Sequence, residues 1–105
     1  MQTQNKLGIS KITLIVEGVL QVQFNRNWSI DDYAQLSEYL LSIASAQALE
    51  HIQGADLQCL RLQFENAQLM LTFEEYSQSC WFECATVQDQ QALLSLQQVL
   101  LRALP

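Results

Sequence analysis

The stretch LRLQFENAQLMLTF, residues 60–73, decides the fold because it predicts a β-hairpin almost residue by residue. Apolar and polar residues alternate on both sides of Glu65-Asn66, as they do in strands that bury one face. Asn tolerates the positive φ that short hairpin turns require, so we place the turn at this pair. The register then sets apolar residues opposite one another: Phe64 with Ala67, Leu62 with Leu69, and Leu60 with Leu71.

The same alternation continues on both sides of this hairpin. It predicts strands at about 57–64 and 67–73 and a third at 79–85. If the register continues into the third strand, the pairs are Phe82 beside Leu71 and Cys84 beside Leu69.

An earlier hairpin is predicted from ISKITLIV, residues 9–16, and LQVQF, residues 20–24. Both segments alternate, and a turn through residues 17–19 keeps their apolar faces together. The pairs that this turn sets are Val16 with Leu20 and Leu14 with Val22.

A helix is expected to begin in NWSIDDYAQL, where two adjacent carboxylates could also suggest catalysis. Ser29 is the predicted N-cap, and Asp32 takes the place of the usual Glu in a capping box. Trp28 and Tyr33 flank the cap as a hydrophobic staple. The helix dipole stabilises ionised Asp31 and Asp32, so these carboxylates are interpreted as capping groups and not as a catalytic pair.

Helical periodicity could extend to Gln53, with Gly54 as the stop. A straight helix of about 24 residues would be roughly 36 Å long, whereas strands of eight residues reach only about 26 Å. We therefore expect a break or bend within SAQALEH, residues 45–51. A final helix is predicted after Thr86 and Asp89, which repeat the cap arrangement, with an apolar stripe that runs to Leu104.

The predicted order is ββαβββα, which indicates an α+β fold: a two-layer sandwich of a mostly antiparallel five-stranded sheet with two helices on one face. Residues 1–105 are expected to form a single domain, with 1–6 as a loose N-terminal tail. The strand order stays open, because the helical crossover can place the first hairpin on either edge of the sheet.

The chain has a formal net charge of −6 with 11 acidic and only five basic residues. Nucleic acids and anionic membrane surfaces are therefore not expected partners, because both require clustered Lys and Arg. No apolar run is long enough to span a membrane, and no signal-peptide pattern precedes the first strand, so we expect a cytoplasmic protein.

The three cysteines are expected to be reduced thiols. In a strand, Cys80 and Cys84 would be roughly 13 Å apart, too far for a mutual disulfide or a shared zinc ion. With His51 as the only histidine, a tetrahedral metal site is not expected. We predict no cofactor and no catalytic residues, because phosphate-loop, nucleophile-elbow and metalloprotease motifs are missing from the sequence. Cys59 is the only plausible reactive thiol, and its predicted neighbours are not clearly electropositive.

Two helices can cover only one side of a five-stranded sheet, so the alternate positions of the strands should form a second face without a helical layer. In the assumed register this face has three cross-strand rows. The rows are Cys59, Thr72 and Trp81; Arg61, Met70 and Glu83; and Gln63, Gln68 and Ala85. The first hairpin contributes Thr13, Ile15, Gln21 and Gln23.

This second face predicts an interface, because aromatic residues, Met and Arg are enriched in interface cores. The predicted interface residues are Ile15, Cys59, Arg61, Met70, Trp81 and Glu83. Another interpretation stays open: Trp81 lies flat on the sheet, and isolated apolar residues are tolerated in water.

The whole chain resembles small uncharacterised cytosolic proteins of γ-proteobacteria through its Gln-rich, acidic ββαβββα pattern. That resemblance implies no activity and no site residues. The leading hypothesis is a non-enzymatic protein–protein interaction module that forms a homodimer, or binds another protein, through the second sheet face. The alternative is a small-molecule binding or catalytic domain with a pocket between sheet and helices near Tyr33, Tyr76 and Cys84.

Overall fold

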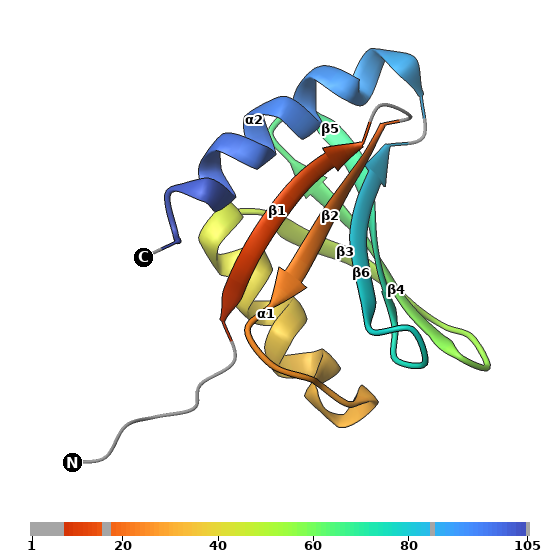
Figure 1. The fold of residues 1–105 in the computed structure, drawn as a ribbon. Helices are drawn as coiled ribbons and strands as arrows, with labels where there is room; N and C mark the ends of the chain where they lie inside the picture. Colours follow the sequence, from red (N-terminus) through yellow and green to blue (C-terminus); the bar gives the residue numbers. More distant parts are fainter. Residues whose placement is uncertain (1–7, 16–17, 85, 105) are drawn as a thin grey trace.

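The computed structural model describes residues 8–15, 18–84 and 86–104. Within these described ranges, two helices and six strands form the fold, and a short 3-10 turn precedes each helix (Figure 1). In chain order the elements are β1 (Ile9–Ile15), β2 (Val19–Phe24), α1 (Tyr33–Ala44), β3 (Gln47–Gln53), β4 (Leu57–Phe64), β5 (Ala67–Glu74), β6 (Ser79–Cys84) and α2 (Gln90–Leu101).

The strands form one antiparallel sheet in the order β1-β2-β6-β5-β4-β3. The α+β class is therefore confirmed, while the predicted number of strands is wrong, since the sheet has six strands and not five. The first hairpin lies beside β6, which settles the position that the sequence left open. Consequently α1 connects β2, on one side of the sheet, with β3 at the opposite edge (Figure 1).

The central register is confirmed at every predicted pair. Phe64 pairs with Ala67, and the continuation into β6 pairs Leu71 with Phe82 and Leu69 with Cys84. The turn differs in one respect: Glu65, with φ of 54°, and not Asn66, has the positive φ. The register is thus held by the apolar faces, because these pairs form although the left-handed residue is not the one expected.

The predicted register of the first hairpin is wrong. Leu14 pairs with Leu20, and Val22 pairs with Ile12. The turn comes one residue earlier than expected, with Gly18 at φ of 84° donating its N–H to the carbonyl of Ile15 at 3.0 Å. A shift of two in register leaves each side chain on its own face, so hydrophobic alternation cannot distinguish the two alignments. The expected position of Val16 and the loose tail at 1–6 lie outside the described residues.

The expected break within residues 45–51 falls at Ser45, but the segment after it is a strand, so the predicted helical character up to Gln53 is wrong. The helix ends at Ala44, where Ser45 adopts a left-handed conformation with φ of 54°. The N–H of Ala46 donates to the carbonyl of Leu41 at 2.9 Å, and that of Ser45 to Ser42 at 3.2 Å. These are the two hydrogen bonds of a Schellman motif, which usually has Gly at its left-handed position. The chain then leaves as the edge strand β3.

The N-terminus of α1 follows its sequence prediction. Ser29 Oγ accepts from the N–H of Asp31 at 3.2 Å, and Asp32 Oδ2 accepts from the N–H of Ser29 at 2.9 Å. Trp28 and Tyr33 both pack edge-on against Phe73 in β5, with ring centroids 5.4 and 5.2 Å away. Asp32 therefore belongs to the cap through its carboxylate and Asp31 through its backbone N–H, and the two aromatic rings anchor the helix to the sheet.

The N-terminus of α2 does not repeat this cap. The Thr86 hydroxyl donates to the Asp89 carboxylate at 3.2 Å, and no side-chain hydrogen bond caps the backbone there. The apolar stripe of α2 nevertheless packs as expected: Leu93, Leu96 and Leu100 are fully buried. Packing against the sheet therefore accounts for this helix better than its cap does.

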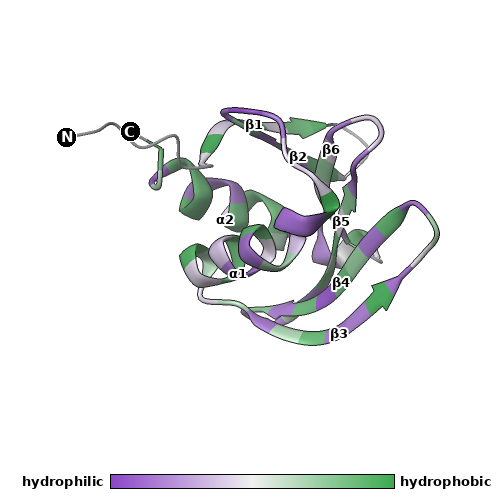
Figure 2. Cartoon of the chain, turned by 90° about the horizontal axis from the view of Figure 1, so that it is seen from below, coloured by the Kyte–Doolittle hydropathy of each residue, from purple (hydrophilic) through white to green (hydrophobic). Residues whose placement is uncertain are grey.

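Both helices lie on the same side of the sheet, which curves around them (Figure 2). Between sheet and helices, one row of side chains crosses five strands in register: Leu14, Leu20, Phe82, Leu71 and Leu60. The last four of these are at most 1 % exposed. This row is the centre of the core, and the face on the other side of the sheet is convex.

The left-handed Ser45 yields a test of the helix end. Ser45→Gly should raise the free energy of unfolding by about 0.5–1 kcal/mol, because glycine has no steric penalty in the left-handed conformation. The larger entropy that glycine loses on folding offsets only part of this gain. Chemical denaturation measures the change. As the matched control, Ser42→Gly in the last turns of α1 should lower stability by about 0.5 kcal/mol. A loss of stability in both variants would contradict the Schellman geometry.

Candidate interaction surface

The convex side of the sheet, called here the open face, is organised in two cross-strand rows that span all six strands. The tryptophan row consists of Thr13, Gln21, Trp81, Thr72, Cys59 and Ile52. The arginine row consists of Ile15, Val19, Glu83, Met70, Arg61 and Glu50.

All six predicted interface residues fall into these rows and are half-buried. Trp81 and Cys59 belong to the tryptophan row, and Met70, Arg61 and Glu83 lie together at the centre of the arginine row. In the third predicted row, Gln63 pairs with Gln68, and Ala85 lies outside the described residues.

Ile15 takes a less central position than its partners. It lies at the end of the arginine row on the edge strand β1, paired with Val19. It also lines a separate hollow next to α2 together with Gln90 and Leu94. Ile15 is therefore at the margin of the open face.

The sequence prediction missed three members of the rows. Val19 lies in the predicted turn, and Glu50 and Ile52 lie in the segment predicted as helix, which is the strand β3 in the structure. The alternation of Glu50 and Ile52 could have indicated a strand, but Ala48, Leu49 and Glu50 also favour helix. In β3 a bulge at Leu49 resets the alternation, which is why Glu50 reaches the arginine row.

Trp81 leans along its own strand. Its indole Nε1 donates to Glu83 Oε2 at 3.1 Å, and Glu83 is two residues further on the same face. Thr72, its neighbour on β5, is only 3 % exposed although no helix covers this side. The side chains of the tryptophan row therefore cover one another, as the interpretation of a Trp lying flat on the sheet implies.

Cys59 is a half-buried member of the tryptophan row. Its Sγ lies 3.6 Å from Thr72 Oγ1, so the thiol points to the open face. The carbonyl of the same residue lies 3.4 Å from the Tyr33 hydroxyl. The Cys59 carbonyl thus contacts Tyr33 and its thiol contacts Thr72. Within the described residues, the contacts of the sulfur do not include a basic side chain.

The Tyr33 hydroxyl lies 2.9 Å from His51 Nδ1, with the two rings edge to face at 5.9 Å. Burial, and secondly the charge of the Cys59 thiolate, raises the pKa of Tyr33 above its ordinary value. His51 lies on the strand β3, within the segment predicted as helical, and its side chain is exposed. This pair ties α1 to the edge strand.

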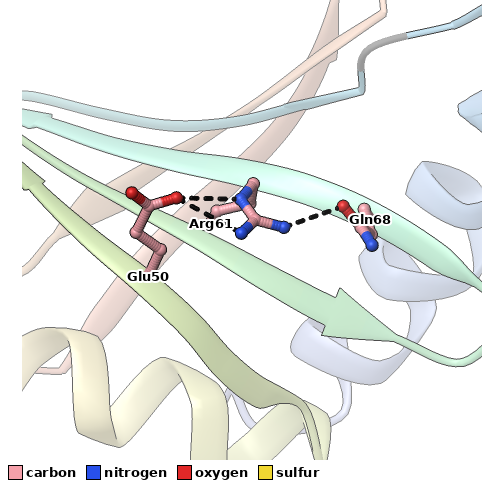
Figure 3. Close-up of polar contacts among 3 residues, drawn as sticks. All are labelled: Glu50, Arg61 and Gln68. Carbon is pink, nitrogen blue, oxygen red and sulfur yellow. Dashed lines mark hydrogen bonds and ion pairs between the residues drawn. The ribbon is translucent and has the colours of Figure 1, made fainter.

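Arg61 is the centre of a polar network on the open face (Figure 3). Its Nε and Nη2 donate to one oxygen of Glu50 at 3.3 and 3.2 Å, and Nη1 donates to Gln68 at 3.0 Å. The side chains of Arg61 and Glu50 are 38 and 55 % exposed, so water competes with this ion pair and it adds little to stability. The three hydrogen bonds place the guanidinium between Glu50 on β3 and Gln68 on β5.

Two hollows are relevant to the predicted pocket. One, of about 270 Å³, lies beside Met70, between Arg61 and Glu83, and Cys84 is part of its wall. The other, of about 460 Å³, lies at the far end of the sheet beside Trp28, Leu57 and Tyr76. Tyr76 and Cys84 thus line different hollows, and Tyr33 lines neither of them. The structure does not bring these three residues together.

The side chains of the described part of the chain do not form any cluster of three or more metal-ligating His, Cys, Asp or Glu residues. Neither of the two helices is long and apolar enough to cross a membrane, over the described ranges.

Comparison with known families adds one finding. Residues 12–102 match the model of a family described as a protein of unknown function (DUF3630). The chain belongs to this family. The matched segment extends from the middle of β1 to the residue after α2, so it includes both rows of the open face. No curated protein and no solved structure matches the chain.

The three free thiols give a test of both sides of the sheet. Cys80 is 1 % exposed and faces the core, where burial raises the pKa of its thiol well above the ordinary value. Because thiolates are the reactive form, Cys80 should react with a disulfide reagent only as the protein unfolds. Cys59 and Cys84 should react in the native protein, as followed by absorbance.

The control is the double variant Cys59→Ser/Cys84→Ser. It should show no reaction in the native state and one thiol in denaturant. Native reaction of this variant would place Cys80 outside the core.

Proposed function

We propose that this protein is a non-enzymatic interaction module, a two-layer sandwich that self-associates through its open face. The observation that carries the proposal is the make-up of the central strands on that face. Trp81, Met70 and Cys59 lie there next to Arg61 and Glu83, while both helices lie on the opposite side (Figure 2). Aromatic residues, Met and Arg are the residue types that interface cores favour.

A second copy is favoured as the partner because the open face contains both signs of charge. Arg61 and Glu83 lie on strands on either side of β5. A strongly basic or strongly acidic partner would meet a like charge at one of them, whereas an identical face can match both. Other partners are outcomes that the experiments below distinguish.

The curvature of the sheet limits the strength of this association. A convex face can approach a like face only along its central strands (Figure 2). Three strands at about 4.8 Å and six to eight residues long present roughly 300–400 Å² in projection, less than the roughly 800 Å² per partner of a standard interface. We therefore propose a transient homodimer with a Kd on the order of 1–100 µM.

Cytoplasmic location and a γ-proteobacterial origin stay predictions from the sequence. Reduced thiols at Cys59, Cys80 and Cys84 are in accord with a reducing compartment.

Sedimentation velocity across a concentration series tests the proposal. The wild-type chain should shift from monomer to dimer over the micromolar range. Met70→Asp should weaken self-association at least about tenfold, since it replaces an apolar side chain at the centre of the contact with a charge that must be desolvated. Trp81→Ala should weaken it as well, by removing apolar area and the hydrogen bond to Glu83.

The matched control is Leu94→Asp, which places the same charge on an exposed apolar residue of α2, in the helical layer. This variant should associate like the wild type. A wild-type chain that stays monomeric to several hundred micromolar, or a dimer that only Leu94→Asp disrupts, would contradict self-association through the open face.

The alternative, a small-molecule domain, has one observation in its favour. The hollow of about 460 Å³ beside Trp28 and Tyr76 has the volume of a ligand pocket. If it binds a metabolite, thermal unfolding in the presence of a metabolite panel should show a higher Tm with one class of compound. Tyr76→Ala should abolish that shift, and uniform melting temperatures would argue against this alternative.

A further inference from the structure

The centre of the arginine row has a symmetric arrangement of opposite charges. Met70 on β5 pairs with Arg61 on β4 and with Glu83 on β6, so a cation and an anion lie on either side of one thioether. Neighbouring strands are about 4.8 Å apart, which places the two charges at nearly equal distances from β5. Reversing the order of the strands exchanges the positions of the two charges.

We propose that the second copy docks with a two-fold axis that runs along β5 and passes over Met70. In this arrangement Arg61 of each subunit faces Glu83 of the partner subunit. The inference rests on the self-association proposed above and adds its geometry. It names the residue that meets its own copy, Met70, and the two ion pairs that form across the interface.

Symmetry leaves few choices for such a contact. Two identical faces that meet in a closed dimer are related by a two-fold axis lying in the plane between them. With an axis parallel to β5, β4 of one subunit lies over β6 of the other. With an axis along the rows, each strand lies over the same strand of the second subunit. The first axis sets Arg61 against Glu83 of the partner, and the second sets no cation against an anion within the row. Charge complementarity therefore selects the axis along β5.

The side chains have free capacity for this contact. A guanidinium has five N–H groups, and the hydrogen bonds of Arg61 to Glu50 and Gln68 occupy three of them. Glu83 accepts from Trp81 through Oε2, which leaves Oε1 for a partner. The hollow of about 270 Å³ between Arg61 and Glu83, beside Met70, leaves space for a side chain of the second copy.

Complementation between two charge-reversed chains tests the axis. Alone, Arg61→Glu should dimerise at least about 100-fold more weakly than the wild type, because each contact becomes a carboxylate pair. Glu83→Arg should weaken to a similar extent through two guanidinium pairs. An equimolar mixture should form a heterodimer within about tenfold of the wild-type affinity, since both contacts then join opposite charges.

Sedimentation velocity and native mass spectrometry of the separate and mixed chains measure these affinities, and circular dichroism confirms that each variant is folded. Glu50→Gln is the matched control, because it removes the ion pair within the subunit and leaves both proposed contacts in place. It should dimerise like the wild type.

The outcomes separate this inference from the proposed function. Dimerisation that Met70→Asp weakens, but that the charge-reversed chains leave unchanged, would keep the open face as the interface and overturn the axis. Weakening in both single variants without recovery in the mixture would also overturn the axis. A homodimer that neither Met70→Asp nor charge reversal affects would overturn both and indicate pairing of the exposed edge strand β3.

Discussion

The register of the β4–β5 hairpin is the constraint on which the rest of the structure depends. Once Leu60 faces Leu71, the two-residue period of strands sends Arg61 and Met70 to the opposite side of the sheet. The same register continues through Phe82 in β6 to Leu20 in β2. One hairpin thus determines both the core row that is covered by helices and the two rows that are left on the open face.

The sequence predicts the parts of the fold in which only one strand register buries all the apolar side chains of an alternating pattern. In the central strands, a shift of the register by one residue would move Phe64 or Leu62 to the solvent face. In the observed register these side chains are at most 2 % exposed. The first hairpin has shorter strands and mostly leucine, isoleucine and valine at its inward positions, so a shift by two costs little in burial. The position of Gly18 at φ of 84° determines which alignment forms.

The edge strand β3 could not be predicted from the same signals. QALEHIQ is made largely of good helix formers, and its side chains are all exposed, so no buried stripe distinguishes strand from helix. This segment is a strand because it forms hydrogen bonds with β4 and because the Schellman turn at Ser45 ends the helix before it. In that turn a serine takes a position usually occupied by glycine. The sequence predicts the candidate surface except for Val19 and the two residues from β3, Glu50 and Ile52.

The glutamines bear on how the open face could be covered. Beyond the arginine row, Gln47, Gln63 and Gln68 form a row of amides across β3, β4 and β5. Removing water from an amide costs less free energy than removing it from a carboxylate or an ammonium group. Amides can both donate and accept, and Gln68 accepts from Arg61 Nη1 at 3.0 Å. A margin of neutral amides around one cation and one anion keeps the open face hydrated in the monomer. When the face is covered, removing water from these amides costs a moderate amount of free energy. The amides also place no charge on this margin, so the sign of the central contacts is determined by Arg61 and Glu83, with Glu50 at the far end of their row.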